Sequence, residues 1–113
     1  MAGWTASERE RRERVEAGGT VVANLKTDLR LIAWAKKTGR FARICRPTIW
    51  GNPFVIGKDG DREQVLESCK KYLAGERELL QRLGELQGKV LGCWCHPEHC
   101  HGDELIRLIE GGE

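Results

Sequence analysis

The stretch Leu91-Gly92-Cys93-Trp94-Cys95-His96-Pro97-Glu98-His99-Cys100-His101-Gly102-Asp103 joins an apolar segment to a polar loop and to the start of a helical pattern. It contains three of the five cysteines and all three histidines of the chain. The apolar segment predicts a strand, and the apolar residues at 105, 106, 108 and 109 predict a helix after the loop. Ligands of open α/β sheets bind at the carboxyl ends of strands and at helix N-termini. The stretch therefore predicts reactive side chains at a ligand-binding edge of a sheet.

Two further strands are predicted upstream of this stretch. Thr20–Leu25 and Phe41–Cys45 are short and rich in β-formers, and a helix from Asp28 to about Thr38 separates them. A strand–helix–strand unit implies parallel strands. Lys89–Cys95 is almost continuously apolar, which is typical of a central strand that is covered on both faces. The pattern predicts a small Rossmann-like three-layer α/β domain with a mostly parallel sheet of at least three strands flanked by helices.

The domain is expected to comprise residues 20–113, preceded by a charged N-terminal arm over residues 1–19. The arm is almost wholly charged between Ser7 and Glu16, and Thr5 with Glu8 is the pattern of a capping box. We expect a solvated helix there because the segment has almost no apolar face. Further along, Asp61 with Gln64 predicts the start of an amphipathic helix that carries Cys69 towards the core.

Composition describes an ordinary globular chain of 113 residues with 40% hydrophobic and 32% charged residues. The net charge of +2 produces no strong overall field towards nucleic acid or membrane. No apolar run reaches the roughly 20 residues that a membrane span needs. Five cysteines without a secretory signal favour reduced thiols, so a cytoplasmic location is expected.

The segment Arg46–Phe54 predicts a packed loop. Two prolines, a glycine and an asparagine exclude a regular element, yet Ile49, Trp50 and Phe54 are too apolar for a free linker. If the strands are parallel, the loops that follow Cys45 and Cys95 leave the sheet at the same edge. The sequence therefore predicts a crevice between the Arg46–Phe54 loop and the Cys95–Asp103 loop.

The residue types in these loops suit a small nucleotide-like or other anionic ligand. Arg46 can hold a phosphate or carboxylate, Asn52 can read an amide or base edge, and Trp50 offers a stacking face. Any chemistry is expected from imidazole and thiol groups near the N-terminus of the last helix, where the dipole lowers a thiol pKa. The predicted catalytic residues are His101, Cys100, Cys95 and Asp103, and the predicted ligand-binding residues are Arg46, Trp50, Gly51, Asn52 and Gly102. Whether the ligand is transformed stays open.

The alternative is a zinc-stabilised, non-catalytic module that binds nucleic acid or protein. Cys93, Cys95, Cys100 and His101 form a donor set suited to zinc. Their spacing is less favourable, because structural zinc sites usually separate paired cysteines by at least two residues. A purely structural interpretation makes Cys93 and Cys95 core residues of a buried strand and places Trp94 in the core on the opposite face.

Two further partners are considered on weaker grounds. A basic cluster follows the first core helix, which is the kind of patch that phosphate binding needs, but acidic residues elsewhere nearly cancel its charge. Its residues are Lys36, Lys37, Arg40, Arg43 and Arg46. Open sheet edges make a homodimer plausible. No membrane partner is expected.

The chain also resembles the domain of unknown function 4326 family, which is common in phages and bacteria. The resemblance extends over roughly residues 20 to 110 and leaves the charged arm outside. It rests on the segments Arg46–Phe54, Asp59–Glu63 and Gly88–Cys95, continued through Pro97, Cys100, His101, Gly102 and Asp103. The family carries no established activity, so the resemblance supports the motifs without implying a substrate.

Overall fold

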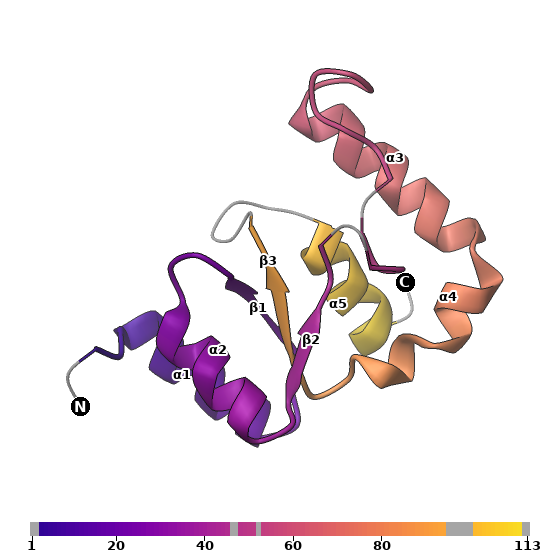
Figure 1. Ribbon diagram of the computed structural model, residues 1–113. Coiled ribbons are helices and arrows are strands. Elements are labelled where there is room, and N and C mark those ends of the chain that lie inside the picture. Colours follow the sequence, from indigo (N-terminus) through magenta and orange to yellow (C-terminus); the bar gives the residue numbers. More distant parts are fainter. Residues whose placement is uncertain (1–2, 46–47, 52, 95–100, 112–113) are drawn as a thin grey trace.

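The computed structural model describes residues 3–45, 48–51, 53–94 and 101–111. The helices are α1 (Ala6–Glu16), α2 (Leu29–Lys37), α3 (Arg62–Gly75), α4 (Arg77–Gln81), the 3₁₀ helix η1 (Leu83–Glu85) and α5 (His101–Gly111). The strands are β1 (Val21–Asn24), β2 (Phe41–Arg43) and β3 (Val90–Cys93). Figure 1 shows them in chain order. The three strands predicted from the sequence are all present, each shorter than its apolar segment.

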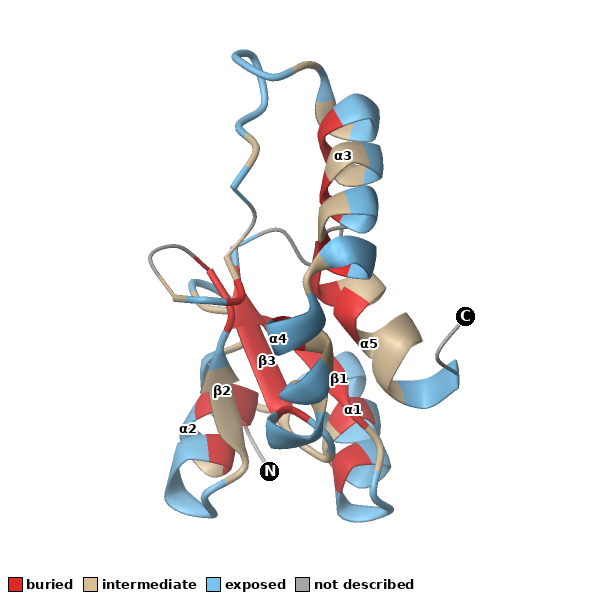
Figure 2. Cartoon of the chain, turned by 90° about the vertical axis from the view of Figure 1, so that its right-hand side faces the viewer, coloured by how far each residue is buried: buried red, intermediate tan, exposed pale blue. Residues whose placement is uncertain are grey.

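The strands form one parallel sheet with the order β1-β3-β2. Val90 of β3 is in register with Val21 of β1 and with Phe41 of β2. All four residues of β3 are buried, as Figure 2 shows. The central position predicted for this strand is therefore confirmed. The unit β1-α2-β2 crosses over β3, because its two strands lie on either side of it.

Side chains alternate between the two faces of β3, and each face has its own core. Val90 packs with Leu31 of α2 and Val15 of α1, whereas Leu91 and Cys93 pack with residues of α3 and α5. Helices thus cover both faces of the sheet, and Figure 1 shows α1 and α2 on one side and α5 on the other. The predicted small α/β domain with a parallel sheet flanked by helices is confirmed.

The charged N-terminal helix is packed into the molecule, so the expectation of a solvated helix was wrong for α1. Its capping box between Thr5 and Glu8 is present as predicted. However, only 2% of Glu8, 7% of Arg11 and 3% of Val15 is exposed. The apolar pattern could not reveal this packing, because two of the three buried residues are charged and are held by polar contacts instead of by a hydrophobic stripe.

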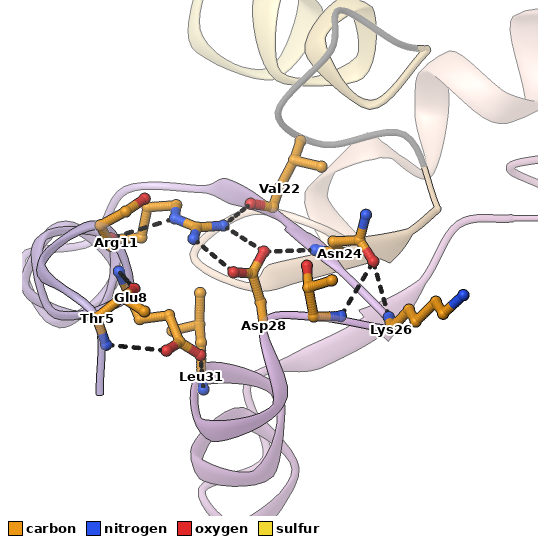
Figure 3. Close-up of polar contacts among 10 residues, drawn as sticks. Thr5, Glu8, Arg11, Val22, Asn24, Lys26, Asp28 and Leu31 are labelled. Atoms are coloured by element: carbon orange, nitrogen blue, oxygen red, sulfur yellow. Dashed lines mark hydrogen bonds and ion pairs between the residues drawn. The ribbon is translucent and has the colours of Figure 1, made fainter. Parts of the chain in front are cut away.

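The start of α2 is capped by another helix. Asp28 stands at the N-cap position, as expected, but its carboxylate makes no cap hydrogen bond. Instead the carboxylate of Glu8 on α1 accepts a hydrogen bond of 3.0 Å from the backbone N–H of Leu31. This is an N–H of the first turn, which a helix leaves without an internal partner. α1 therefore completes α2, and Figure 3 shows the contact.

The predictions for α3 are confirmed. Asp61 and Gln64 form a capping box, and the helix ends at Gly75. Cys69 is buried in the core beneath it, with 1% of its surface exposed. Among the helices that the structure describes, none has the length and apolar character needed to cross a membrane.

Candidate functional site

The carboxyl ends of the three strands meet at one edge of the sheet. Just beyond β2, the backbone N–H of Ile44 donates to the carbonyl of Gly92 at 3.0 Å. Just beyond β1, the N–H of Leu25 donates to the carbonyl of Cys93 at 2.8 Å. The segments after β1, β2 and β3 therefore all begin side by side, which is the geometry expected from parallel strands. We call this region the carboxyl edge.

His101 lies at the carboxyl edge and joins α5 to the end of β2. Its Nε2 is 2.8 Å from the carbonyl oxygen of Ile44, and only 7% of the residue is exposed. A carbonyl oxygen can only accept, so Nε2 carries the proton in this bond. The structure thus gives His101 a clear structural role, and its role as an acid or base stays a prediction.

Trp94 is exposed, so the expectation that it belongs to the core was wrong. Its exposed fraction is 56%, although the neighbouring Cys93 is 1% exposed. The reason is that β3 ends at Cys93, where the pairing with Asn24 of β1 also ends. Beyond that point the sheet no longer imposes an alternation between buried faces. An indole ring is therefore presented at the carboxyl edge.

Asn24 is a residue that sequence reasoning missed. Its Nδ2 donates to the carbonyl of Trp94 at 3.2 Å, and its Oδ1 accepts from the N–H groups of Lys26 and Thr27 at 2.8 and 3.2 Å. Figure 3 shows the contacts of Oδ1 in the turn after β1. The amide holds the backbone of the exposed tryptophan in place. The available signal was a polar amide at the carboxyl end of a predicted strand.

In the loop after β2, Trp50 and Phe54 pack on the core as predicted, whereas Ile49 is 47% exposed. Trp50 is 7% exposed and belongs to the core on the α3–α5 side of the sheet. The N–H of Gly51 donates to the carbonyl of Thr48 at 3.0 Å, which closes a turn. The indole of Trp50 is thus inside the molecule, whereas stacking requires an accessible ring. The ligand-binding roles assigned to Trp50 and Gly51 stay predictions.

Four of the predicted site residues, Arg46, Asn52, Cys95 and Cys100, lie outside the described residues. Two others follow His101 in the first turn of α5: Gly102 is buried, and Asp103 is partly exposed. His101, which precedes them, contacts the carbonyl of Ile44 just beyond β2. Their roles in binding or catalysis stay predictions.

The described cysteines are all buried, and none of them forms a disulfide. Burial, and to a lesser extent the carboxylate of Glu104, raises the pKa of the Cys69 thiol to about 11. Cys69 is therefore protonated at neutral pH and is a poor nucleophile. Near the end of β2, Nε of Arg43 donates to Sγ of Cys45 at 2.9 Å.

Two of the four proposed zinc ligands lie in the described part of the chain. Cys93 and His101 are buried, and the other two proposed ligands are outside the described ranges. Within those ranges, no group of three or more histidine, cysteine or acidic side chains is arranged to hold a metal ion. Because Nε2 of His101 is bonded to a carbonyl, only its Nδ1 could ligate a metal without breaking that bond. The four donors still suit zinc chemically.

Comparison with known proteins places the chain in a family. A family model described as a domain of unknown function (DUF4326) matches residues 30–111. The chain belongs to this family. The match includes nearly all of α2 and the whole of β2, β3 and α5, whereas α1 and β1 precede it.

Two relatives of this DUF4326 protein are found in viruses. An uncharacterised protein of Acanthamoeba polyphaga mimivirus is 37% identical over 69 residues, which are 54% of this chain and 52% of that protein. An uncharacterised 12.4 kDa protein from the nrdA-td intergenic region of Enterobacteria phage T4 is 38% identical over 71 residues, which are 58% of this chain and 64% of that protein. The matches thus span only about half to two thirds of each relative. No solved structure matches the chain significantly.

Proposed function

We propose that this DUF4326 protein binds a small, planar, anionic ligand of the nucleotide type at its carboxyl edge. The observation that carries the proposal is the exposed indole of Trp94, held beside the ends of β1 and β3. Open parallel sheets bind ligands at this edge. An exposed tryptophan on a fixed backbone offers a flat apolar surface, which suits the face of a base.

The residues around the ring have separate tasks in this proposal. Asn24 is a positioning residue, because its side-chain amide is hydrogen-bonded to the backbone of Trp94 after β3 and to the backbone of Lys26 after β1. The N-terminus of α5 favours an anion through its helix dipole. Arg46, which follows β2 in the sequence, is proposed to hold the same anion. Trp94 takes over the stacking role that the sequence suggested for Trp50.

A chemical step, if there is one, would use the second ring nitrogen of His101. Its Nε2 proton is donated to the Ile44 carbonyl, so proton exchange with a ligand would proceed at Nδ1. Cys100, Cys95 and Asp103 remain the proposed participants in such a step. Binding, and not turnover, is the function that we propose first.

Native mass spectrometry of freshly purified protein, in buffers free of chelator, tests the proposal and its alternative together. A mass added by a nucleotide-like compound would support it and identify the compound class. One zinc ion per chain, with a melting temperature that falls on chelation, would support the zinc-stabilised module instead. If the protein carries no added mass, the nucleotide titration described next decides whether it binds such a ligand.

Tryptophan fluorescence should report the binding. Nucleoside mono-, di- and triphosphates, with inorganic phosphate as a control, are titrated into the protein. Trp94→Ala should abolish saturable binding without unfolding the chain, because Trp94 is 56% exposed. The matched control is Ile56→Ala, which removes another apolar side chain that is 51% exposed. Binding that survives Trp94→Ala, or no binding of any nucleotide, would refute the proposal.

His101→Gln separates a structural from a chemical role. A glutamine amide can still donate to the Ile44 carbonyl, but it cannot exchange a proton near neutral pH. We expect it to preserve the fold and the nucleotide affinity, whereas His101→Ala should destabilise the chain. Loss of affinity in the folded glutamine variant would show that the imidazole itself contacts the ligand.

A further inference from the structure

A second surface, on the side of α1 and α2, presents arginines against tryptophan rings. Cζ of Arg12 lies 5.3 Å from the ring centroid of Trp4 and 5.1 Å from that of Trp34. Cζ of Arg40 lies 5.2 Å from the Trp34 ring. Trp34 therefore has two guanidinium groups against it, and Arg12 has two indoles against it. α1, α2 and the segment before β2 each contribute to this cluster.

Neighbouring cations extend the cluster into a band. Arg9 donates from Nη1 to the carbonyl of Trp4 at 3.0 Å. Arg30 packs on the backbone of Gly3, since a Cβ placed there would lie 2.5 Å from its Nε. Lys37 is exposed one helical turn beyond Trp34. The basic band is defined here as Arg9, Arg12, Arg30, Lys37 and Arg40.

The acidic and basic residues of α1 alternate in the sequence, but the folded helix buries some of them and exposes others. Glu8 points inward, where its carboxylate accepts from the N–H groups of Leu31 and Thr5, so its negative charge is not on the surface. Arg11 also points inward and pairs with Asp28. Glu13 and Glu16 follow Arg9 and Arg12 by four residues and so lie on the same face of α1, where Oε2 of Glu16 pairs with Nε of Arg12 at 3.5 Å.

The band holds more positive charge than the chain as a whole. Its five cations and these two carboxylates sum to +3, whereas the whole chain carries +2. The rest of the molecule is therefore net negative by one charge. Such an asymmetric distribution attracts a polyanion to one face. Contact with the indoles also restricts Arg12 and Arg40 before any partner binds, which reduces the entropy that binding must remove.

We infer that the basic band binds the phosphate backbone of single-stranded nucleic acid. Its cations can contact successive phosphates, and its partly exposed Trp4 and Trp34 offer edges on which unpaired bases can stack. A duplex buries the faces of its bases, so it could use only the cations. This surface is distinct from the carboxyl edge and does not depend on the function proposed for Trp94.

Fluorescence anisotropy of a labelled single-stranded oligonucleotide tests the inference. The expected Kd is about 10⁻⁴ to 10⁻⁶ M at physiological salt, as for other sequence-independent electrostatic binding. Arg12→Gln and Lys37→Gln should each weaken binding roughly three- to tenfold at low salt. Each should also lower the slope of log K against log salt by about 0.7, because each removes about one phosphate contact from a single strand.

Matched variants make the test specific. Arg82→Gln removes an exposed arginine of similar size that pairs with Glu85 away from the band, and it should leave the affinity unchanged. Lys37→Gln tests the band even if Arg12→Gln perturbs the fold, because Lys37 is exposed and makes none of the ring contacts of Arg12.

Three outcomes would overturn the inference. They are no oligonucleotide binding at about 50 mM salt, an equal loss in Arg82→Gln, and equal competition by a poly-glutamate peptide of the same charge. Equal affinity for duplex and single strand, without quenching of tryptophan fluorescence, would refute the preference for a single strand. Quenching that accompanies single-strand binding supports it.

Discussion

Arg11 and Asp28 form an ion pair that is almost wholly enclosed. Nη2 of Arg11 is 3.0 Å from Oδ1 of Asp28, with 8% and 13% of the two side chains exposed. Nη1 of Arg11 also donates to the carbonyl of Val22 at 2.7 Å, and Oδ2 of Asp28 accepts from the N–H of Asn24. One guanidinium thus links α1 to the strand and to the turn that precedes α2 (Figure 3).

Arg11→Ala should lower the free energy of unfolding by about 3 kcal/mol, because it leaves a buried carboxylate and a buried carbonyl without this donor. Urea denaturation followed by far-UV circular dichroism measures the change. The matched control is Arg82→Ala, which removes an arginine from an ion pair with side chains 42% and 52% exposed. Little or no change is expected there. Equal effects of the two substitutions would show that burial is not what makes the Arg11 pair important.

The Cys69 thiol of the native protein should react slowly with alkylating reagents at moderately alkaline pH. Its pKa is raised from 9.0 to about 11, so at pH 8 its thiolate fraction is about a hundredfold smaller than in the unfolded chain. Brief treatment with iodoacetamide, followed by peptide mass spectrometry, should modify Cys69 in urea but not in the native protein. Rapid alkylation of the native protein would contradict the assignment.

The same pKa predicts a pH dependence of stability. Below about pH 9 both the folded and the unfolded state carry the neutral thiol, so Cys69 contributes no pH dependence. As the pH rises from about 9 to about 11, the unfolded state loses its proton first, and the free energy of unfolding falls. Cys69→Ala should remove this part of the decline, which urea titrations at several pH values would detect.

Among the elements, β3 depends on a glycine at its most crowded point. A Cβ at position 92 would lie 2.8 Å from Cδ2 of Leu25 and 2.8 Å from ring atoms of Phe41. Both neighbours come from segments that flank β3 in the sheet. Only a residue without a side chain lets them close over this strand.

Gly92→Ala should therefore lower the free energy of unfolding by about 1 to 3 kcal/mol, the usual cost of overpacking. Gly84→Ala is the matched control, because nothing lies within 4 Å of its added Cβ. That substitution should be neutral or should stabilise the chain by up to about 1 kcal/mol. Chemical denaturation of both variants measures the difference. A neutral result at position 92 would mean that Leu25 and Phe41 move apart at little cost.

At the scale of the whole molecule, α1 and α2 together cover one face of the sheet. Glu8 caps α2, Arg11 binds the turn before it, and Val15 packs against the sheet side of the same core. α1 is therefore expected to unfold together with the sheet.

Deletion of residues 1–17 should destabilise the chain more than Arg11→Ala alone, because it removes the ion pair, the cap and the apolar contact together. Thermal unfolding followed by circular dichroism compares the two. The double substitution Glu10→Ala with Glu13→Ala is the control, because both residues are exposed on α1. If the deleted chain kept the original melting temperature, α1 would be an independent appendage.

Much of the fold follows from local patterns. The β-branched run that becomes β1, the capping box at Asp61 and the continuous apolar run of β3 each depend on neighbours in the chain, so each was predictable. The convergence of the strand ends followed from the parallel arrangement. The burial of Glu8 and Arg11 did not, because their partners lie 23 and 17 residues away in the sequence.

The candidate site also has some features that the local sequence predicts and others that depend on tertiary contacts. The clustering of His101, Gly102 and Asp103 near the end of β2 was predictable, because a strand–loop–helix pattern places the helix start at that edge. Trp94 was predicted to lie in the core and is exposed, whereas Trp50, in the loop that was predicted to be packed, is buried. Which ring is exposed depends on where β3 ceases to pair with β1, and that depends on both strands together.

The amino-acid sequence alone determined the parallel α/β class, the central strand and the shared edge at which the strands end, because hydrophobic periodicity and turn residues act locally. The tertiary structure decided which charges are internal, which indole is presented to solvent and which arginines are held on one face. Those outcomes depend on contacts between groups that are distant in the chain. Such contacts contribute to stability only once the layers have packed.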